Sequence, residues 1–126
     1  MIRIDIPATS ANLGSGFDSL GIALTMCNRV WMEEADELKI TTTDKIKVPT
    51  DETNLIYWAA RHLYQICGKT LPGLHIIQEN NIPMARGLGS SSACIVAGIL
   101  GANRMLGSPM SQSDLINLAA QIEGHP

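Results

Sequence analysis

Alternating apolar and polar residues predict β-strands in the first third of the chain. The first strand, over residues 2–6, alternates isoleucine with Arg3 and Asp5 and ends at Pro7, which is the two-residue period of a half-buried strand. The pattern over residues 22–43 is also strand-like, and the acidic run at residues 33–36 within it is predicted to form a solvated hairpin turn. Residues 45–49 are expected to add a short edge segment.

A helical period follows these strands. Thr50 or Asp51 is the expected N-cap, Glu52 suits the first turn, and Gly68 is the expected stop. The apolar residues that recur at helical spacing are Leu55, Ile56, Ala59, Ala60, Leu63, Ile66 and Cys67.

A strand and two more helices are predicted in the second half. The strand covers residues 74–78, and a helix over residues 90–105 carries small residues that allow close approach to a sheet. Ser111 and Asp114 resemble a capping box that opens the last helix. The expected buried stripe of that helix is Leu115, Leu118, Ala119 and Ile122.

The segment PMARGLGSSSA, residues 83–93, is the strongest candidate for a binding site. Gly87 and Gly89 let a bound group approach the backbone, and three serines follow where a helix would begin. Free amides and the positive end of a helix dipole suit phosphate. The alternative, that the glycines form a simple turn and the serines are caps, stays open at this point.

A second cluster of turn-forming residues lies at residues 7–24, PATSANLGSGFDSLGIAL. It must form a constrained loop, and its Asn12 and Asp18 are polar groups suited to holding a ligand. Both residues could instead cap turns through their own backbone.

Composition narrows the class of protein. The chain has 126 residues, 45% of them apolar and 17% charged, with a net charge of −3, as in an ordinary globular domain. No basic cluster indicates nucleic-acid binding, and the longest apolar run, residues 93–102, is too short to cross a membrane. Because no signal segment opens the chain, a cytoplasmic location is the default expectation.

Cysteine and histidine give no sign of a metal site. Cys27, Cys67 and Cys94 are widely spaced and form no CxxC pair, so we expect buried reduced thiols. The three histidines also lack the spacing of metal ligands.

The glycine-rich segment closely resembles the second conserved motif of the GHMP small-molecule kinases, in which a proline precedes GLGSS. The first loop resembles the amino-terminal motif PATSANLGxGFDxLG of the homoserine kinases within that superfamily, and the ending, Glu123-Gly124-His125-Pro126, resembles their EGHPDN segment. Ser92 and Ser15 depart from the residues usual at those positions. The resemblance runs the whole length of the chain.

The resemblance implies a role for each matching residue. Asn12 and Asp18 would hold L-homoserine, with Asp18 also counted among the catalytic residues as a positioning group. Glu123 would be catalytic as the Mg²⁺-binding carboxylate, with Ser91 also touching the metal, and Asn54 would contact the nucleoside end of ATP. The residues implied to wrap the ATP phosphates are Pro83, Met84, Ala85, Arg86, Gly87, Leu88, Gly89, Ser90, Ser91, Ser92 and Ala93.

The implied reaction is transfer of the γ-phosphoryl group of ATP to the side-chain hydroxyl of homoserine, on the way to threonine. Homoserine kinases are more than twice as long, so residues 1–126 would be an incomplete N-terminal ATP-binding domain, inactive alone, with the C-terminal domain absent. A small molecule is the expected partner, with neither nucleic acid nor membrane, and a homodimer is left open.

The implied fold is the α+β arrangement of ribosomal protein S5 domain 2, a mostly antiparallel sheet covered by helices. The predicted order of elements agrees with α+β but does not specify the topology. Two rival interpretations remain: another GHMP kinase, acting on mevalonate or a sugar, and a non-catalytic S5-like structural module.

Overall fold

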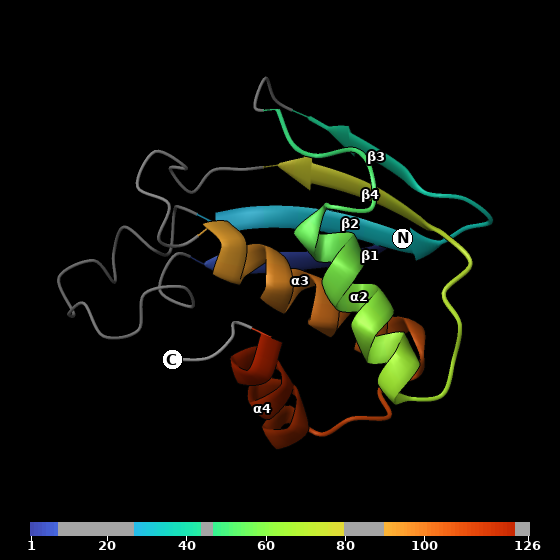
Figure 1. Ribbon diagram of the computed structural model, residues 1–126. Coiled ribbons are helices and arrows are strands. Elements are labelled where there is room, and N and C mark those ends of the chain that lie inside the picture. Colours follow the sequence, from blue (N-terminus) through green and yellow to red (C-terminus); the bar gives the residue numbers. More distant parts are fainter. Residues whose placement is uncertain (8–26, 44–46, 80–89, 123–126) are drawn as a thin grey trace, which may run out of the picture.

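The protein is a four-stranded sheet with helices on one face, seen in a computed structural model that describes residues 1–7, 27–43, 47–79 and 90–122 (Figure 1). The α+β class predicted from the sequence is confirmed. The elements are β1 (Ile2–Pro7), β2 (Cys27–Glu34), β3 (Lys39–Thr42), α2 (Leu55–Ile66), β4 (Leu74–Glu79), α3 (Ser90–Met105) and α4 (Gln112–Ile122).

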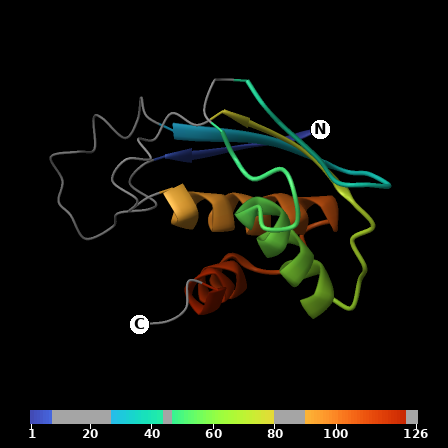
Figure 2. The same ribbon diagram turned by 45° about the horizontal axis from the view of Figure 1, so that its top comes forward.

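The strands lie in the order β1-β2-β4-β3. β1 pairs with β2 and β2 with β4, both antiparallel, whereas β3 pairs with β4 in parallel. The sheet is therefore mostly antiparallel, as expected. Figure 2 shows α2 and α3 beneath one face of this sheet and α4 beneath α3, while none of the described segments covers the other face.

The predicted hairpin between β2 and β3 is wrong, because β4 lies between these two strands. Glu33 and Glu34 belong to β2 rather than to a turn. The connection to β3 packs on the chain entering β4: the Ala35 amide donates to the Gly73 carbonyl at 3.2 Å, and a Cβ on Gly73 would collide with the Glu37 backbone. The missing side chain of Gly73 thus makes room for the inserted strand.

The first predicted helix is confirmed, but its expected cap is wrong. Asn54, rather than Thr50 or Asp51, is the N-cap of α2, and its side chain accepts hydrogen bonds from the amides of Ile56 and Tyr57. Asp51 instead closes a turn before the helix, accepting from the Thr53 amide at 2.9 Å. Those bonds from Thr53 lower the pKa of the Asp51 carboxyl.

The end of α2 follows the prediction. Gly68 has φ of +73°, a left-handed conformation that glycine adopts without steric cost. Its amide donates to the Gln65 carbonyl, and the next amide, of Lys69, donates to the Tyr64 carbonyl at 2.8 Å. Beyond β3, the described residues 47–49 form no strand, so the expected edge segment is absent there.

α3 has the predicted bounds and packs through its small residues in two directions. A Cβ on Gly98 would meet the Ile56 carbonyl of α2, and one on Gly101 would meet the Met32 side chain of β2. The small residues therefore allow close approach to a neighbouring helix as well as to the sheet.

α4 begins as predicted and packs against α3. The Asp114 amide donates to the Ser111 hydroxyl at 3.2 Å, and Leu118 is the buried residue of the helix, with the other three of the expected stripe half-buried. Asn103 fixes the preceding turn by exchanging two hydrogen bonds with the Met110 backbone. In the described part of the chain, no helix combines the length and apolar character needed to span a membrane.

Candidate functional site

The described residues that flank the two sequence motifs meet at one end of the sheet. Pro7, where β1 ends, pairs with Cys27, where β2 begins, so both attachment points of the first motif lie together. Glu79, where β4 ends, pairs with Arg29 of β2, and Figures 1 and 2 place the start of α3 at the same end. The motif at residues 7–24 and the motif at residues 83–93 are thus attached to neighbouring points of one scaffold, which we call the motif end.

The C-terminal end of α4 also points to the motif end. In both views α4 runs back along the direction opposite to α3, so Ile122 lies on the side where α3 starts. Glu123 is the next residue along the chain. The element order alone does not reveal this convergence, because it depends on the antiparallel packing of α4 on α3.

Most residues predicted to form the site lie outside the described part of the chain. Asn54, Ala93 and the backbone of Ser90, Ser91 and Ser92 are described. The predicted residues outside it are Asn12, Asp18, Pro83, Met84, Ala85, Arg86, Gly87, Leu88, Gly89 and Glu123. Their roles stay predictions.

The serines that close the glycine-rich motif begin a long helix. Ser90 is the first residue of the 16-residue α3, which carries no acidic residue in its first turn and has Arg104 in its last. The first amides of a helix have no partner within it, and its dipole gives that end a partial positive charge. Ala93, 1% exposed, anchors the first turn in the core. The start of α3 can therefore bind an anion.

Asn54 sits in a buried cluster of amide side chains near the motif end. Its Oδ1 accepts from the Ile56 amide at 2.9 Å and the Tyr57 amide at 3.3 Å, while its Nδ2 donates to the Pro49 carbonyl at 2.8 Å and to Gln78 Oε1 at 2.9 Å. An amide side chain offers two donors and two acceptor positions, so protein partners occupy all four. A side-chain contact with ATP, which remains a prediction, would require one of these bonds to be exchanged.

An ion-pair cluster on the open face of the sheet also lies at the motif end. Arg29 Nη1 is 2.9 Å from Glu79 Oε2, and Arg29 Nε is 3.8 Å from Asp5 Oδ1. The cluster joins β1, β2 and β4 two residues or fewer from their ends. Sequence reasoning missed both Gln78 and Arg29, although the alternation of β4 places Gln78 on the inward row with Leu74 and Ile76.

Burial also controls the chemistry of α3. It raises the pKa of the Cys94 thiol to about 11, so this group stays protonated at neutral pH. Cys67 and Cys94 are free thiols and half-buried, less buried than expected, while the side chain of Cys27 lies outside the described part. In the described ranges of the chain, no cluster of histidine, cysteine and acidic residues could hold a metal ion.

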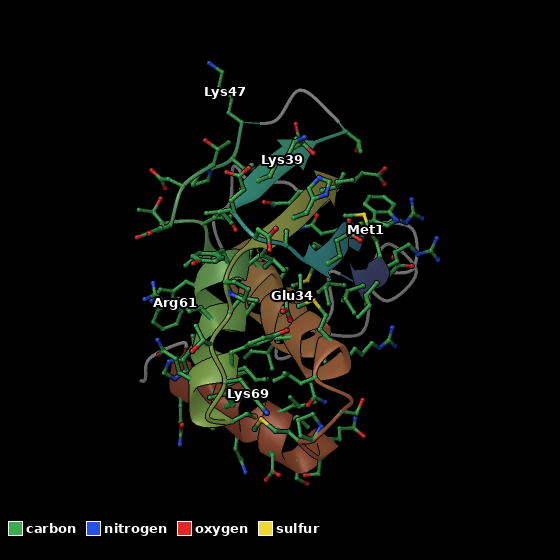
Figure 3. The ribbon with its side chains drawn as sticks, turned by 90° about the vertical axis from the view of Figure 1, so that its right-hand side faces the viewer. Met1, Glu34, Lys39, Lys47, Arg61 and Lys69 are labelled. Atoms are coloured by element: carbon green, nitrogen blue, oxygen red, sulfur yellow. The ribbon has the colours of Figure 1, made fainter. Side chains whose placement is uncertain are left out.

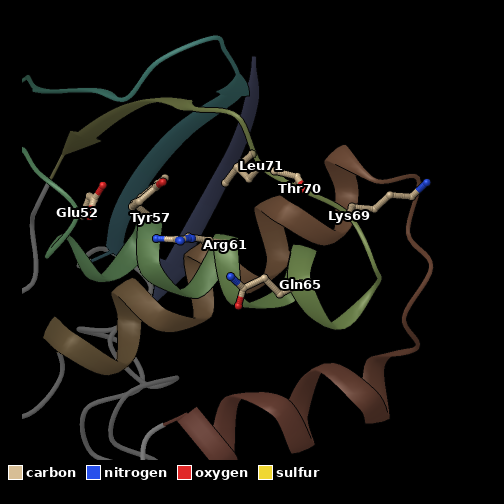
Figure 4. Close-up of a pocket in the computed structure, with 7 residues that line it drawn as sticks. All are labelled: Glu52, Tyr57, Arg61, Gln65, Lys69, Thr70 and Leu71. Atoms are coloured by element: carbon tan, nitrogen blue, oxygen red, sulfur yellow. The ribbon is translucent and has the colours of Figure 1, made fainter.

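A shallow groove of about 210 Å³ runs along the outer face of α2. Its polar lining includes Tyr57, Arg61 and Gln65, and Figure 4 shows the Lys69 side chain at the far end of the helix pointing away from the groove. Figure 3 shows Arg61 and Lys69 on the outward side of α2. The groove starts beside Glu52 and Tyr57, near the start of α2, and follows the helix away from the motif end (Figures 1 and 4).

Known proteins resemble this chain over nearly its whole length. The family of GHMP kinases N terminal domains matches residues 54–126. Homoserine kinases of Trichodesmium erythraeum and Petrotoga mobilis are 49% and 47% identical to the chain, each over 99% of it.

A solved homoserine kinase from Cytophaga hutchinsonii superposes with a TM-score of 0.72 at 28% identity over 97% of the chain. GHMP kinases have the ribosomal S5 domain 2-like fold, so the fold expected from the sequence is confirmed. The chain spans 43% and 42% of the two curated relatives and 40% of the solved structure.

Proposed function

Because this chain belongs to the GHMP kinases, as their N-terminal domain, we propose that the complete protein transfers the γ-phosphoryl group of ATP to the side-chain hydroxyl of L-homoserine. The product is O-phospho-L-homoserine, on the way to threonine. Residues 1–126 are the ATP-binding portion, and the rest of the active-site cleft comes from a C-terminal domain beyond this sequence. The cytoplasm, where ATP is available, is the proposed location.

The observation that carries the proposal is the attachment of both motifs at one end of the sheet. The pairing of Pro7 with Cys27 and of Arg29 with Glu79 makes the attachment points neighbours. Two segments anchored this way can present a nucleotide and its acceptor to each other. The similarity to homoserine kinases over 99% of the chain supports homoserine as that acceptor.

Residues 83–93 bind the phosphates in this proposal. Gly87 and Gly89 permit close approach of the backbone, and the amides at the start of α3 donate to phosphate oxygens. Phosphoryl transfer requires alignment and neutralisation of charge more than covalent chemistry from the protein. A rigid helix start supplies fixed donors without reorganisation during the reaction.

Asn12 and Asp18 bind homoserine. The Asp18 carboxylate pairs with the substrate ammonium group and holds the hydroxyl in line with the γ-phosphate, so it acts as a positioning group. We expect Asp18→Asn in the complete enzyme to raise KM for homoserine at least about tenfold, the loss of about 1.4 kcal/mol of binding. Loss of turnover with a normal KM would show that Asp18 has another role.

Ser91 and Glu123 would hold Mg²⁺. A hydroxyl and a carboxylate oxygen are donors that Mg²⁺ prefers, and both residues follow from described points at the motif end, the start of α3 and the end of α4. When bound, the metal supplies positive charge that neutralises the phosphate oxygens. Glu123 would then have a cation for its charge at the unfavourable, negative end of the α4 dipole.

The test is a substrate comparison with the complete protein. Magnesium-dependent conversion of ATP to ADP is measured with homoserine, mevalonate and shikimate, and the product is identified by phosphorus NMR. The proposal predicts phosphohomoserine and little turnover of the other two. Preference for mevalonate would replace the proposed substrate, and absence of turnover with homoserine would refute the proposed function.

A further inference from the structure

We propose that Gln78 is a positioning residue for nucleotide binding, which fixes the exit of β4 into the phosphate-binding segment against the start of α2. This role rests on the proposed function. It is carried by the buried bond between Gln78 and Asn54, and by the short distance along the chain from Gln78 to residues 83–93.

Gln78 is the one polar residue on the inward row of β4. Leu74 and Ile76 precede it at two-residue spacing, and all three side chains are at most 2% exposed. Burying an amide costs free energy unless its hydrogen bonds are replaced. An apolar side chain could be buried here at a lower cost in free energy. Packing alone therefore does not explain why an amide occupies this position.

The bond to Asn54 ties together segments that are distant in the chain. Gln78 Oε1 accepts from Asn54 Nδ2 at 2.9 Å, a buried contact across 24 residues. Asn54 in turn caps α2 and holds the Pro49 carbonyl. The backbone carbonyl of Gln78 also accepts from the Thr43 amide beyond β3 at 3.0 Å. Three segments, the chain after β3, the chain at Pro49 and the start of α2, are thus fixed relative to the end of β4.

Gln78 lies close in the chain to the phosphate-binding segment, so its hydrogen bond to Asn54 can affect nucleotide binding. The phosphate-binding segment starts five residues after Gln78, and at its other end α3 packs on α2 through Gly98 and Ile56. Along the chain the segment follows β4 and leads into α3; α2 packs on α3, and its N-cap Asn54 bonds Gln78 of β4. Loss of the Gln78–Asn54 bond would loosen the end of β4 and leave the packing of α3 on α2 intact. A loosened attachment point weakens ligand binding because preorganisation is lost.

The experiment compares Gln78→Met with Glu79→Gln in the complete protein. Methionine has nearly the length of glutamine but cannot accept the Asn54 hydrogen bond, so it removes the bond and fills the space. Glu79 is adjacent in sequence but lies on the open face, where its side chain is 27% exposed and paired with Arg29, and Glu79→Gln is the matched control.

We expect Gln78→Met to raise KM for MgATP about tenfold, to lower kcat less than about threefold and to leave KM for homoserine unchanged. Glu79→Gln should leave all three constants within about twofold of the unsubstituted protein. A normal KM for MgATP in Gln78→Met would overturn the proposal. So would a fall in kcat alone, which reports only less folded enzyme.

Titration with a fluorescent ATP analogue separates this inference from the proposed function. If the unsubstituted protein binds the analogue without phosphorylating homoserine, the proposed function fails, yet the ratio of dissociation constants for Gln78→Met and the unsubstituted protein still decides the role of Gln78. About tenfold weaker binding supports it, and equal binding refutes it.

Hydrogen exchange provides a test should Gln78→Met not fold. In the unsubstituted complete protein, MgATP should slow exchange at the amides of Ile56 and Tyr57, which Asn54 caps. Exchange unchanged by MgATP at these two amides would show that the cluster is not coupled to the nucleotide, and would overturn the proposal.

Discussion

Gln78 and Glu79 are neighbours in the chain but lie in opposite environments. Gln78 faces the helices and is 2% exposed, with its amide bonded to Asn54. Glu79 faces the open side of the sheet and pairs with Arg29, whose side chain is 42% exposed. Both clusters join the ends of several elements at the same place, so they differ mainly in burial.

The difference in burial indicates which polar contacts contribute most to the stability of this fold. A buried amide that loses its partner is left without water to replace it, at a cost of about 1–3 kcal/mol. An exposed ion pair that loses its partner is solvated, and such pairs contribute about 0–1 kcal/mol. We therefore expect the buried pair of Gln78 and Asn54, the inward cluster, to organise the motif end. The ion pairs of Arg29 with Asp5 and Glu79, the outward cluster, should contribute little to stability.

The largest effect is expected for Asn54→Ala. The substitution removes the cap of α2 and the Asn54 Nδ2 donor to Gln78 Oε1 and to the Pro49 carbonyl, so the free energy of unfolding should fall by about 3 kcal/mol. Urea unfolding of the 126-residue chain measures it. Thr53→Ala, which removes only an exposed bond to Asp51, is the control, and equal losses in both variants would contradict the comparison.

Much of the fold follows from periodicity, but the pairing of strands does not. Alternation identified β1, β2 and β4, and the small residues identified α3. The hairpin predicted at residues 33–36 was wrong because alternation fixes which face a residue occupies and not which strand lies beside it. The insertion of β4 depends on a long-range contact between Ala35 and Gly73, for which the local sequence carries no signal.

The site could be predicted only in part for a similar reason. Spacing of glycine and serine located the start of α3, and the cap at Asn54 was missed because Thr50 and Asp51 are equally good capping residues. The choice among them depends on Gln78, which lies 24 residues further along the chain. Partners across the sheet decide such cases, and one sequence does not show them.

A smaller effect is expected for Tyr64→Phe, at the opposite end of α2 from Asn54. The Tyr64 hydroxyl donates to Glu34 Oε2 at 2.9 Å, so its loss should cost about 1 kcal/mol in urea unfolding. Burial and the Glu34 carboxylate raise the pKa of Tyr64, so this contribution should be present below about pH 10 and be lost as the pH rises further. A loss of stability as large as that of Asn54→Ala would show that polar contacts at the motif end contribute no more to stability than those at the opposite end of α2.

Arg29→Met should have a still smaller effect, although it removes the ion pairs of Arg29 with Asp5 and with Glu79. The expected loss is about 0.5 kcal/mol, and it should shrink as salt concentration rises. Urea unfolding at low and high salt checks both statements. A salt-independent loss of more than about 2 kcal/mol in the free energy of unfolding would contradict the comparison, because the outward cluster would then stabilise the fold as much as the inward one.

The alkylation rate of Cys94 measures how far water is excluded from the inward side of the sheet, and it needs no substitution. Because burial raises its pKa to about 11, iodoacetamide at pH 8 should alkylate Cys94 about a hundredfold more slowly in the folded chain than in urea. Peptide mass spectrometry measures the two rates. Equal rates would mean that water reaches the first turns of α3 freely.

The central claim is that the motif end holds the nucleotide, and paramagnetic broadening tests it most directly. Mn²⁺ with a non-hydrolysable ATP analogue is added to the isotope-labelled complete protein, and amide signals are followed by NMR. The account predicts broadening centred on Ser90 to Ala93 and reaching Gln78, with Lys69 to Leu71 at the far end of α2 unaffected. Broadening centred on the groove beside Arg61, with the start of α3 unchanged, would contradict it.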